Sequence, residues 1–366
     1  MLKFLDDQLT PLWNKVVSGE RLSVEDCQTL YNSPDILGVG WMANQVKEKR
    51  WGKKAFYVLN QKIEPTNECV LDCSFCDFAA KPKSERAYRM SIDEILSKCS
   101  DEITEVHVSG GMPPDWRMAD YETIVRSIHE KFPHVAIKAF TAVEIEWCAR
   151  VSKLSVEEVL THLKAVGLAA LPGGGAEVFS DRVRAELFPH KIGYREWLSV
   201  HRKAHELGIP SNATLLYGHI ETPQERWVHL DLLRKTQDKA PGFMSFIPLA
   251  FQPGTTGLKT QSPTMNDDLK MLAISRLFLD NFPHIKAYWI TLGEETASVG
   301  LQFGADDIDG TIGGEKIMHA AGAQSPTGLL VNRLEQLIKE ARCIPVQRDG
   351  LYNEVPLVAQ EFVQTV

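Results

Sequence analysis

Three cysteines lie close together in the segment Asn-Glu-Cys-Val-Leu-Asp-Cys-Ser-Phe-Cys-Asp-Phe, residues 67–78. Three residues separate Cys69 from Cys73, two separate Cys73 from Cys76, and the aromatic Phe75 stands directly before the last cysteine. Three thiolates on one short loop can bind three irons of a cubane iron–sulfur cluster, and the sequence offers no fourth cysteine nearby. The fourth iron of such a cluster stays open to another ligand.

Two other interpretations of these cysteines remain. A structural zinc ion takes four protein ligands, so a distant histidine would have to complete the set, and zinc sites rarely use this spacing. Three unligated thiols this close together would be prone to oxidation. An iron–sulfur cluster is therefore the favoured hypothesis.

The spacing and Phe75 resemble the signature of the radical SAM superfamily. In that superfamily S-adenosylmethionine (SAM) chelates the open iron through its amino and carboxylate groups, and one electron from the cluster breaks a C–S bond of the sulfonium. The cleavage leaves a 5′-deoxyadenosyl radical. The resemblance therefore implies a 4Fe–4S cluster and SAM as a co-substrate.

The composition is that of an ordinary globular chain. The 366 residues are 44% hydrophobic with a mean hydropathy of -0.18, which allows two domains or one large α/β barrel with appended ends. Acidic and basic residues are interleaved at a net charge of -8, so we expect neither nucleic acid nor a membrane surface as a partner.

The N-terminal residues 1–7 lack the apolar core of a signal peptide, and no run of about 18 apolar residues follows. We therefore expect a cytoplasmic protein without membrane insertion. The four cysteines outside the cluster motif are scattered, which is not typical of a disulfide framework. They are Cys27, Cys99, Cys148 and Cys343.

Strand and helix patterns alternate along most of the chain. Capping signals at residues 91–94, 155–158 and 222–225 mark helix starts between the strands. Eight strands, each followed by a helical pattern, predict an α/β fold closed as a (β/α)₈ barrel of the TIM type. The expected strands are 56–59, 106–108, 135–140, 168–171, 212–217, 243–249, 285–291 and a weaker one at 306–311.

Three segments follow from this pattern. Residues 1–54 are expected to form an N-terminal helical extension, in which Ser23 and Asp26 cap one helix and residues 36–49 form another. Residues 55–324 form the barrel. Residues 325–366 form a C-terminal extension packed on the barrel, with a last helix at 329–341 and an irregular tail.

In such barrels the chemistry lies at the carboxyl ends of the strands. Here those ends carry the cysteine loop and several polar or glycine-rich elements. The others are Ser109-Gly110-Gly111, Thr141 with Glu144, residues 173–177, His219 with Glu221, Gln252, and residues 306–314.

Longer stretches resemble one family in particular, the aminofutalosine synthases (aminodeoxyfutalosine synthases) of the futalosine route to menaquinone. The stretches 138–145 and 218–221 favour this family over the sister dehypoxanthine futalosine cyclases, which share the Pro-Gly-Gly-Gly-Ala-Glu element. The same radical SAM group also holds the deazaflavin and thiazole tyrosine-cleaving enzymes. The stretches that carry the resemblance are 69–78, 107–111, 138–145, 171–177, 212–221 and 246–251.

The resemblance implies a reaction in which the adenosyl radical adds to the enolpyruvyl double bond of 3-[(1-carboxyvinyl)oxy]benzoate. Aryl migration and loss of the carboxylate then give 6-amino-6-deoxyfutalosine. Such a reaction requires a dry cavity, groups that hold two substrate carboxylates, and rigid alignment of the radical carbon with the alkene. A donor such as flavodoxin or ferredoxin is the expected source of the electron.

The resemblance also implies roles for cofactor-binding residues. Ser109, Gly110 and Gly111 resemble the element that receives the amino group of SAM, although glycines also mark plain turns. Glu177 is expected at the ribose hydroxyls and Arg182 at the methionine carboxylate, with a surface ion pair as the alternative.

Aromatic and polar residues complete the candidate site. Phe75 is assigned to cofactor binding with the cysteine motif, and Phe78 is expected to stack on adenine unless it is part of the core. His219 and Glu221 are expected to orient the substrate or move a proton during decarboxylation, with a structural role as the alternative. Thr141 is a further catalytic candidate, with weaker signals at Glu144 and His107.

Two other functions remain possible on the sequence alone. The futalosine cyclase would abstract hydrogen and release 5′-deoxyadenosine, whereas the synthase incorporates the adenosyl group into its product. A non-catalytic iron–sulfur electron carrier would have a cluster whose spectrum does not respond to SAM.

Overall fold

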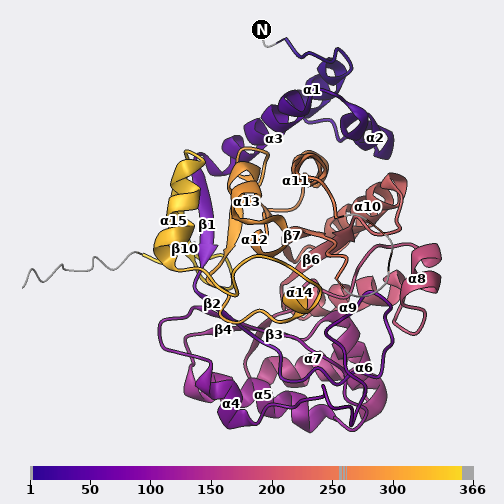
Figure 1. Ribbon diagram of the computed structural model, residues 1–366, viewed down its shortest axis with the longest axis vertical. Helices are drawn as coiled ribbons and strands as arrows, with labels where there is room; N and C mark the ends of the chain where they lie inside the picture. Colours follow the sequence, from indigo (N-terminus) through magenta and orange to yellow (C-terminus); the bar gives the residue numbers. More distant parts are fainter. Residues whose placement is uncertain (1–2, 255–257, 259, 261, 357–366) are drawn as a thin grey trace, which may run out of the picture.

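The computed structural model describes residues 3–254, 258, 260 and 262–356 (Figure 1). The N-terminal residues are helical, as expected, and form α1 (Leu9–Ser18), which no signal had marked, α2 (Val24–Asn32) and α3 (Ile36–Trp51). Ser23 and Asp26 form the capping box of α2, which confirms that signal. α3 packs against α11 (Met265–Phe278), so the N-terminal helices lie on the main body rather than apart from it.

Parallel strands form the centre of the molecule. Three ladders have the orders β10-β1-β9, β2-β3-β4-β5 and β6-β7-β8. Single parallel bridges join them at Leu171 and Ser211, at Lys286 and Asp307, and at Gln61 and Gly313. The strands are β1 (Lys54–Val58), β2 (Asn60–Ile63), β3 (Glu105–Val108), β4 (Ala136–Ala139), β5 (Leu168–Ala170), β6 (Ser211–Tyr217), β7 (Phe243–Ala250), β8 (His284–Ile285), β9 (Asp307–Gly310) and β10 (Ile344–Arg348).

Helices alternate with the strands and surround them (Figure 1). The predicted capping boxes are confirmed at Ser91, Ser155 and Thr222, where a hydroxyl and a glutamate satisfy the free amides of the first turn. The remaining helices are α4 (Ile92–Ser97), α5 (Met118–Lys131), α6 (Ala142–Ser152), α7 (Val156–Ala165), α8 (Asp181–Leu187), α9 (Tyr194–Glu206), α10 (Pro223–Lys239), α12 (Trp289–Leu292), α13 (Glu294–Gly300), α14 (Ile317–Ala320) and α15 (Val331–Glu340). In the described part of the chain, no helix is long and apolar enough to cross a membrane.

Two strand predictions were wrong in detail. The strand expected at 285–291 ends at Ile285, and the buried aromatic residues after it turn into α12, where the indole of Trp289 donates to Gly310 O at 3.0 Å. The first strand is divided at Leu59 because its two halves have different neighbours: β1 pairs with β9 and β10, and β2 pairs with β3.

The tail after α15 is not irregular throughout, as the sequence had suggested. Its residues Ile344–Arg348 form β10, which runs parallel to β1 with Lys54 opposite Ile344 and Val58 opposite Arg348. Pro345 is tolerated because β10 lies at the edge of its ladder and needs few donors there.

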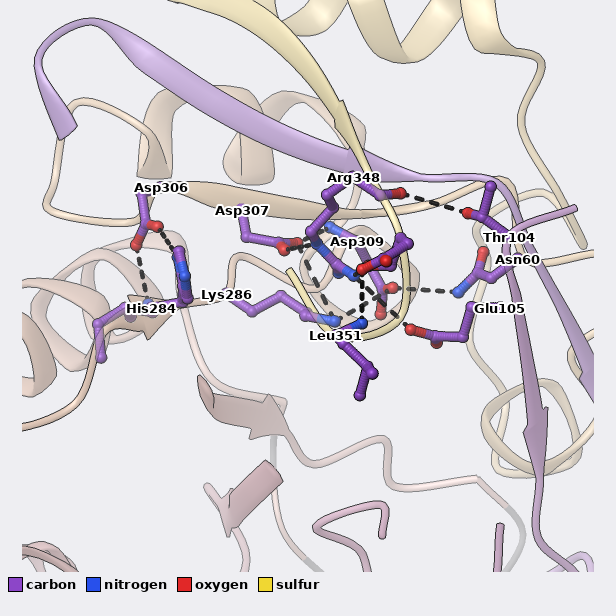
Figure 2. A network of polar contacts seen from close by, with 12 residues as sticks. Asn60, Thr104, Glu105, His284, Lys286, Asp306, Asp307, Asp309, Arg348 and Leu351 are labelled. Atoms are coloured by element: carbon purple, nitrogen blue, oxygen red, sulfur yellow. Dashed lines mark hydrogen bonds and ion pairs between the residues drawn. The ribbon is translucent and has the colours of Figure 1, made fainter. Parts of the chain in front are cut away.

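β10 brings Arg348 to the amino-terminal ends of β3 and β9, where Figure 2 shows it among carboxylates. The Arg348 Nε atom lies 2.6 Å from Asp307 Oδ2, and its Nη1 atom lies 3.6 Å from Glu105 Oε2. This buried network lies at the opposite end of the strands from the cysteine loop.

Candidate functional site

A cavity of about 280 Å³ opens where the strands end. The cysteine loop, the ends of β3 to β7 and the segment around α14 all contribute to its wall. The predicted site residues that line it are Cys69, Cys73, Phe75, Cys76, Phe78, Ser109, Gly110, Thr141 and Glu177.

The three cysteines are free thiols on a loop that backbone hydrogen bonds hold in place. Cys69 N donates to Ala80 O at 2.9 Å, and Ser74 N donates to Leu187 O at 2.9 Å. Burial raises the pKa of Cys73 to about 11, so thiolates here need a cation or a metal to form readily. The loop is therefore fixed from both sides and presents its sulfurs to the cavity.

The donor set fits a cluster better than a single ion. Among the described residues, no three His, Cys, Asp or Glu side chains gather closely enough to hold one metal ion. In a cubane each thiolate binds a different iron, so the sulfurs need not converge on one point. Cys69, Cys73 and Cys76 meet that requirement because all three line the same cavity.

The glycines after β3 lie against the backbone that leads into the cysteine loop. Gly111 N donates to Thr66 O at 2.8 Å, and a Cβ atom on Gly110 would come within 2.6 Å of Thr66 O. A Cβ atom on Gly111 would overlap the Glu68 carbonyl, directly before Cys69. Glycine is therefore required sterically, and Gly111 supports the loop without lining the cavity.

Thr141 and Glu144 form the capping box of α6, and both face the cavity. Oε2 of Glu144 accepts hydrogen bonds from the Thr141 amide and hydroxyl, each at 2.7 Å, while Oε1 accepts from Gly110 N at 3.1 Å. Burial outweighs these hydrogen bonds and raises the pKa of Glu144 to about 7. The carboxyl group thus connects the glycine element to α6.

Glu177 lines the cavity with a backbone in the left-handed region, at φ 47°, which costs a non-glycine residue some energy. Its carboxylate forms an ion pair with Lys191. The Lys191 Nζ atom also lies 4.5 Å from the ring centre of Phe188 and 5.2 Å from that of Phe75. Lys191 is therefore a buried cation beside the cysteine loop, and no sequence motif pointed to it.

Four predicted residues are not among the described residues that line the cavity: Gly111, Arg182, His219 and Glu221. The Arg182 guanidinium is half exposed and donates to Glu225 Oε2 at 2.7 Å and to Ile220 O at 2.9 Å. Its predicted role at SAM would require these contacts to break.

His219 and Glu221 organise the loop after β6. Glu221 accepts from Gly218 N at 2.6 Å and from Arg226 Nε at 2.7 Å. His219 Nε2 lies 3.1 Å from Leu216 O, and its Nδ1 accepts from Ile220 N at 2.8 Å. Burial lowers the pKa of His219, and these partners fit the neutral ring. Their predicted catalytic roles stay predictions.

The deeper wall of the cavity carries cations that the sequence analysis did not assign. Lys62, Lys138 and Lys286 line it together with His107, which had given only a weak signal. A lysine inside a strand has no diagnostic spacing, and its burial depends on residues far away in the chain. Only the alternation of inward and outward positions could have indicated them.

Comparisons with known proteins agree with this geometry. The family profile described as "Radical SAM superfamily" matches residues 63–233, and "CofH/MqnC C-terminal region" matches residues 240–361. The aminodeoxyfutalosine synthase of Thermus thermophilus is 45% identical over 359 residues, covering 96% of each chain. The cyclic dehypoxanthine futalosine synthase of Halalkalibacterium halodurans is 37% identical over 346 residues, covering 93% of each.

Among solved structures, that of methylornithine synthase (PylB) matches with a TM-score of 0.72 at 17% identity. The match covers 91% of this chain and 97% of that one. At this identity the likeness concerns the fold alone, and it supports an α/β fold of the radical SAM type.

Proposed function

Because the chain belongs to the aminodeoxyfutalosine synthase family of the radical SAM superfamily, we propose that it makes 6-amino-6-deoxyfutalosine for menaquinone biosynthesis. Its substrates would be SAM and 3-[(1-carboxyvinyl)oxy]benzoate. The observation that carries the proposal is the placement of Cys69, Cys73 and Cys76 on one cavity in a chain 45% identical to a synthase over 96% of its length.

A 4Fe–4S cluster held by the three cysteines, with SAM on its open iron, supplies a 5′-deoxyadenosyl radical when it receives an electron. The role of the protein is then to bind, to align and to exclude water. Apolar residues such as Leu216, Ile247 and Phe251 contribute to the cavity wall and limit water near the reacting atoms.

The SAM contacts form the next part of the proposal. Ser109, Gly110 and Gly111 would receive the amino group, and Glu177 the ribose hydroxyls. Phe75 and Phe78 lie in the cavity wall, where rings can pack against the cofactor and the adenine. Arg182 remains the candidate for the methionine carboxylate, with Lys191 as a second cation closer to the cysteines.

Three residues are proposed to act on the substrate. We propose that Thr141 acts from the cavity wall, and that His219 and Glu221 act by fixing the loop after β6. Their contribution is positional, since their hydrogen bonds are made within that loop.

The proposal includes a closed (β/α)₈ barrel formed by residues 55–324, with extensions at 1–54 and 325–366. The single bridges between ladders, at Leu171 and Ser211, at Lys286 and Asp307, and at Gln61 and Gly313, support the closure. We further propose a cytoplasmic reaction with reduced flavodoxin or ferredoxin as the electron donor.

Product analysis tests the function. Anaerobically reconstituted protein is incubated with SAM labelled in the adenosyl group, dithionite and the enolpyruvyl benzoate, and the products are identified by mass spectrometry. The synthase incorporates the label into 6-amino-6-deoxyfutalosine. In a parallel incubation with dehypoxanthine futalosine in place of the benzoate, release of labelled 5′-deoxyadenosine from SAM would instead identify a cyclase, the activity named for the relative that is 37% identical.

Two controls complete the experiment. Cys73→Ala should abolish product, whereas Cys99→Ala, at a half-buried thiol that does not line the cavity, should not. A cluster whose electron paramagnetic resonance spectrum does not change with SAM would indicate an electron carrier and contradict the proposal.

A further inference from the structure

Three side chains form a row across the deep wall of the cavity. Lys62 on β2 is the direct neighbour of His107 on β3, and His107 is the direct neighbour of Lys138 on β4. Residues in the same register on adjacent parallel strands face the same side of the sheet. All three line the cavity, so the row is a continuous inner surface.

The row holds hydrogen-bond donors that the protein leaves unused. Lys62 Nζ donates to Glu315 Oε1 at 2.8 Å, and Lys138 Nζ donates to Glu105 Oε2 at 2.7 Å. An ammonium group has three N–H donors, so two on each lysine have no acceptor among the residues that the structure describes. The side chains are only 8% and 2% exposed, which makes unmet donors costly.

His107 adds a neutral donor between the two lysines. Burial and the adjacent charges of Lys62 and Lys138 lower its pKa to about 3, so the ring carries no charge. Its nitrogens have no hydrogen-bond partner within the described chain. One ring N–H is therefore free to donate into the cavity.

The carboxylates beside the lysines do not use up these donors. Glu315 also accepts from the amides of Met318 and His319, at 2.9 and 3.2 Å, so its oxygens are shared between Lys62 and the backbone around α14. Glu105 also lies 3.6 Å from Arg348 Nη1 and is shared between two cations. Each lysine is therefore fixed by one acid and still offers donors to a ligand.

We propose that the row Lys62, His107 and Lys138 binds the ring carboxylate of the aryl enolpyruvyl ether. This assignment rests on the proposed function. A carboxylate offers two oxygens and about four acceptor positions, which suits two ammonium groups and one imidazole N–H.

The position of the row deep in the cavity favours the ring carboxylate over the enolpyruvyl carboxylate as its ligand. His107 lies two residues before Ser109 on the same strand, so its side chain faces the same way about 7 Å deeper in the cavity. The double bond must meet the adenosyl carbon near the cysteine loop. The opposite end of the substrate, the ring carboxylate, then points to the row.

The test compares two ligands at equilibrium. One is 3-[(1-carboxyvinyl)oxy]benzoate and the other is 2-phenoxyacrylate, which lacks the ring carboxylate and keeps the enolpyruvyl group. Each is titrated by calorimetry into cluster-loaded protein with SAM and without reductant, so no turnover occurs. Native protein should bind the benzoate on the order of 10- to 100-fold more tightly, as expected for charge-assisted hydrogen bonds.

The variants are chosen to remove the row without losing the fold. His107→Phe breaks no protein hydrogen bond, and Lys62→Met leaves Glu315 with its amide donors. Lys138→Met is combined with Glu105→Gln so that no buried acid loses its partner. Each should weaken benzoate binding at least fivefold and change phenoxyacrylate binding less than twofold.

Lys47→Met is the matched control, because Lys47 is also fully buried but donates to Cys343 Sγ outside the cavity. It should affect neither ligand. If native protein binds both ligands equally, or if the row variants weaken both equally, the assignment is overturned while the function stands. If native protein binds neither ligand, the proposed function itself fails.

Discussion

The backbone N–H of Gly110 donates a 3.1 Å hydrogen bond to Oε1 of Glu144, which joins the loop after β3 to the first turn of α6. The other oxygen of Glu144 holds Thr141, so one carboxyl group fixes two elements at the cavity wall. If Gly110 receives SAM, the orientation of its peptide depends on Glu144, which the sequence marked only as a weaker catalytic candidate and which the structure shows to cap α6.

Glu144→Gln should weaken SAM binding about 5- to 10-fold, because an amide cannot accept at both ends and one donor loses its partner. Native affinity should rise as pH increases through about 7, where the carboxyl group ionises and accepts more strongly. The variant should lose that pH dependence. Calorimetric titration of SAM into cluster-loaded protein measures both effects.

Glu158→Gln is the matched control, since Glu158 caps α7 in the same way but lies outside the cavity. It should leave SAM affinity unchanged at every pH. Equal losses in the two variants would show that a lost helix cap, rather than the Gly110 contact, is responsible.

Gly111→Ala should weaken the binding of the iron–sulfur cluster by the cysteine loop. The added methyl group would overlap the Glu68 carbonyl, and backbone beside Cys69 would have to move. After identical reconstitution, iron and sulfide content per chain should fall to less than half of the native value, an order-of-magnitude expectation for a displaced ligand. Gly193→Ala is the control, because its new methyl group meets only the movable side chains of Glu196 and Arg184. Native iron content in Gly111→Ala would contradict the steric argument.

Local signals predicted much of the site. The cysteine spacing, the glycines after β3 and the capping boxes at Ser91, Ser155 and Thr222 act over a few residues, so the sequence displays them directly. Strand ends could be read because their polar residues follow apolar runs.

Long-range pairings were not predictable in the same way. The buried ammonium group of Lys62 pairs with Glu315, which lies 253 positions away in the sequence. Residues 344–348 form a strand because they pair with the edge of β1. Lys191 has no motif of its own, and its burial depends on how Phe75, Phe188 and Glu177 meet. Such residues show their role only when the fold brings their partners together.

Lys191→Met should shift the cluster potential to more negative values by about 60 mV, which is ~1.4 kcal/mol for a one-electron couple. The reason is that Lys191 is a buried cation whose charge interacts with Cys73 and Cys76. Potentiometric titration followed by electron paramagnetic resonance measures the shift without turnover.

Arg182→Met is the informative companion to that variant. If Arg182 stays paired with Glu225, the substitution should leave the cluster potential unchanged. SAM affinity should then change by no more than about twofold, as expected for an exposed ion pair. A large loss of SAM affinity in Arg182→Met would support its predicted place at the methionine carboxylate. No change of potential in Lys191→Met would contradict the electrostatic role of Lys191.

Arg348→Met should destabilise the fold by roughly 3–5 kcal/mol near neutral pH, because it leaves buried acids without their counter-charge. Figure 2 shows Arg348 beside Asp307 and Glu105, with Nε 2.6 Å from Asp307 Oδ2. Burial opposes ionisation of Glu105, but Lys138 and Arg348 more than offset it and lower its pKa to about 2. Arg348 and Lys286 likewise lower the pKa of Asp307.

The pH dependence follows from these depressed values. As pH falls from about 4.5 towards 2, the unfolded chain takes up protons before the folded one, so native stability is lost in that window. The difference in free energy of unfolding between the native protein and Arg348→Met should therefore be smaller at about pH 3 than near neutral pH, as measured by urea unfolding. Arg333→Met, at a partly exposed pair with Glu294, should cost less than about 1 kcal/mol at either pH. A gap of constant size at both pH values would mean that Arg348 stabilises the fold through packing rather than through the charges of Asp307 and Glu105.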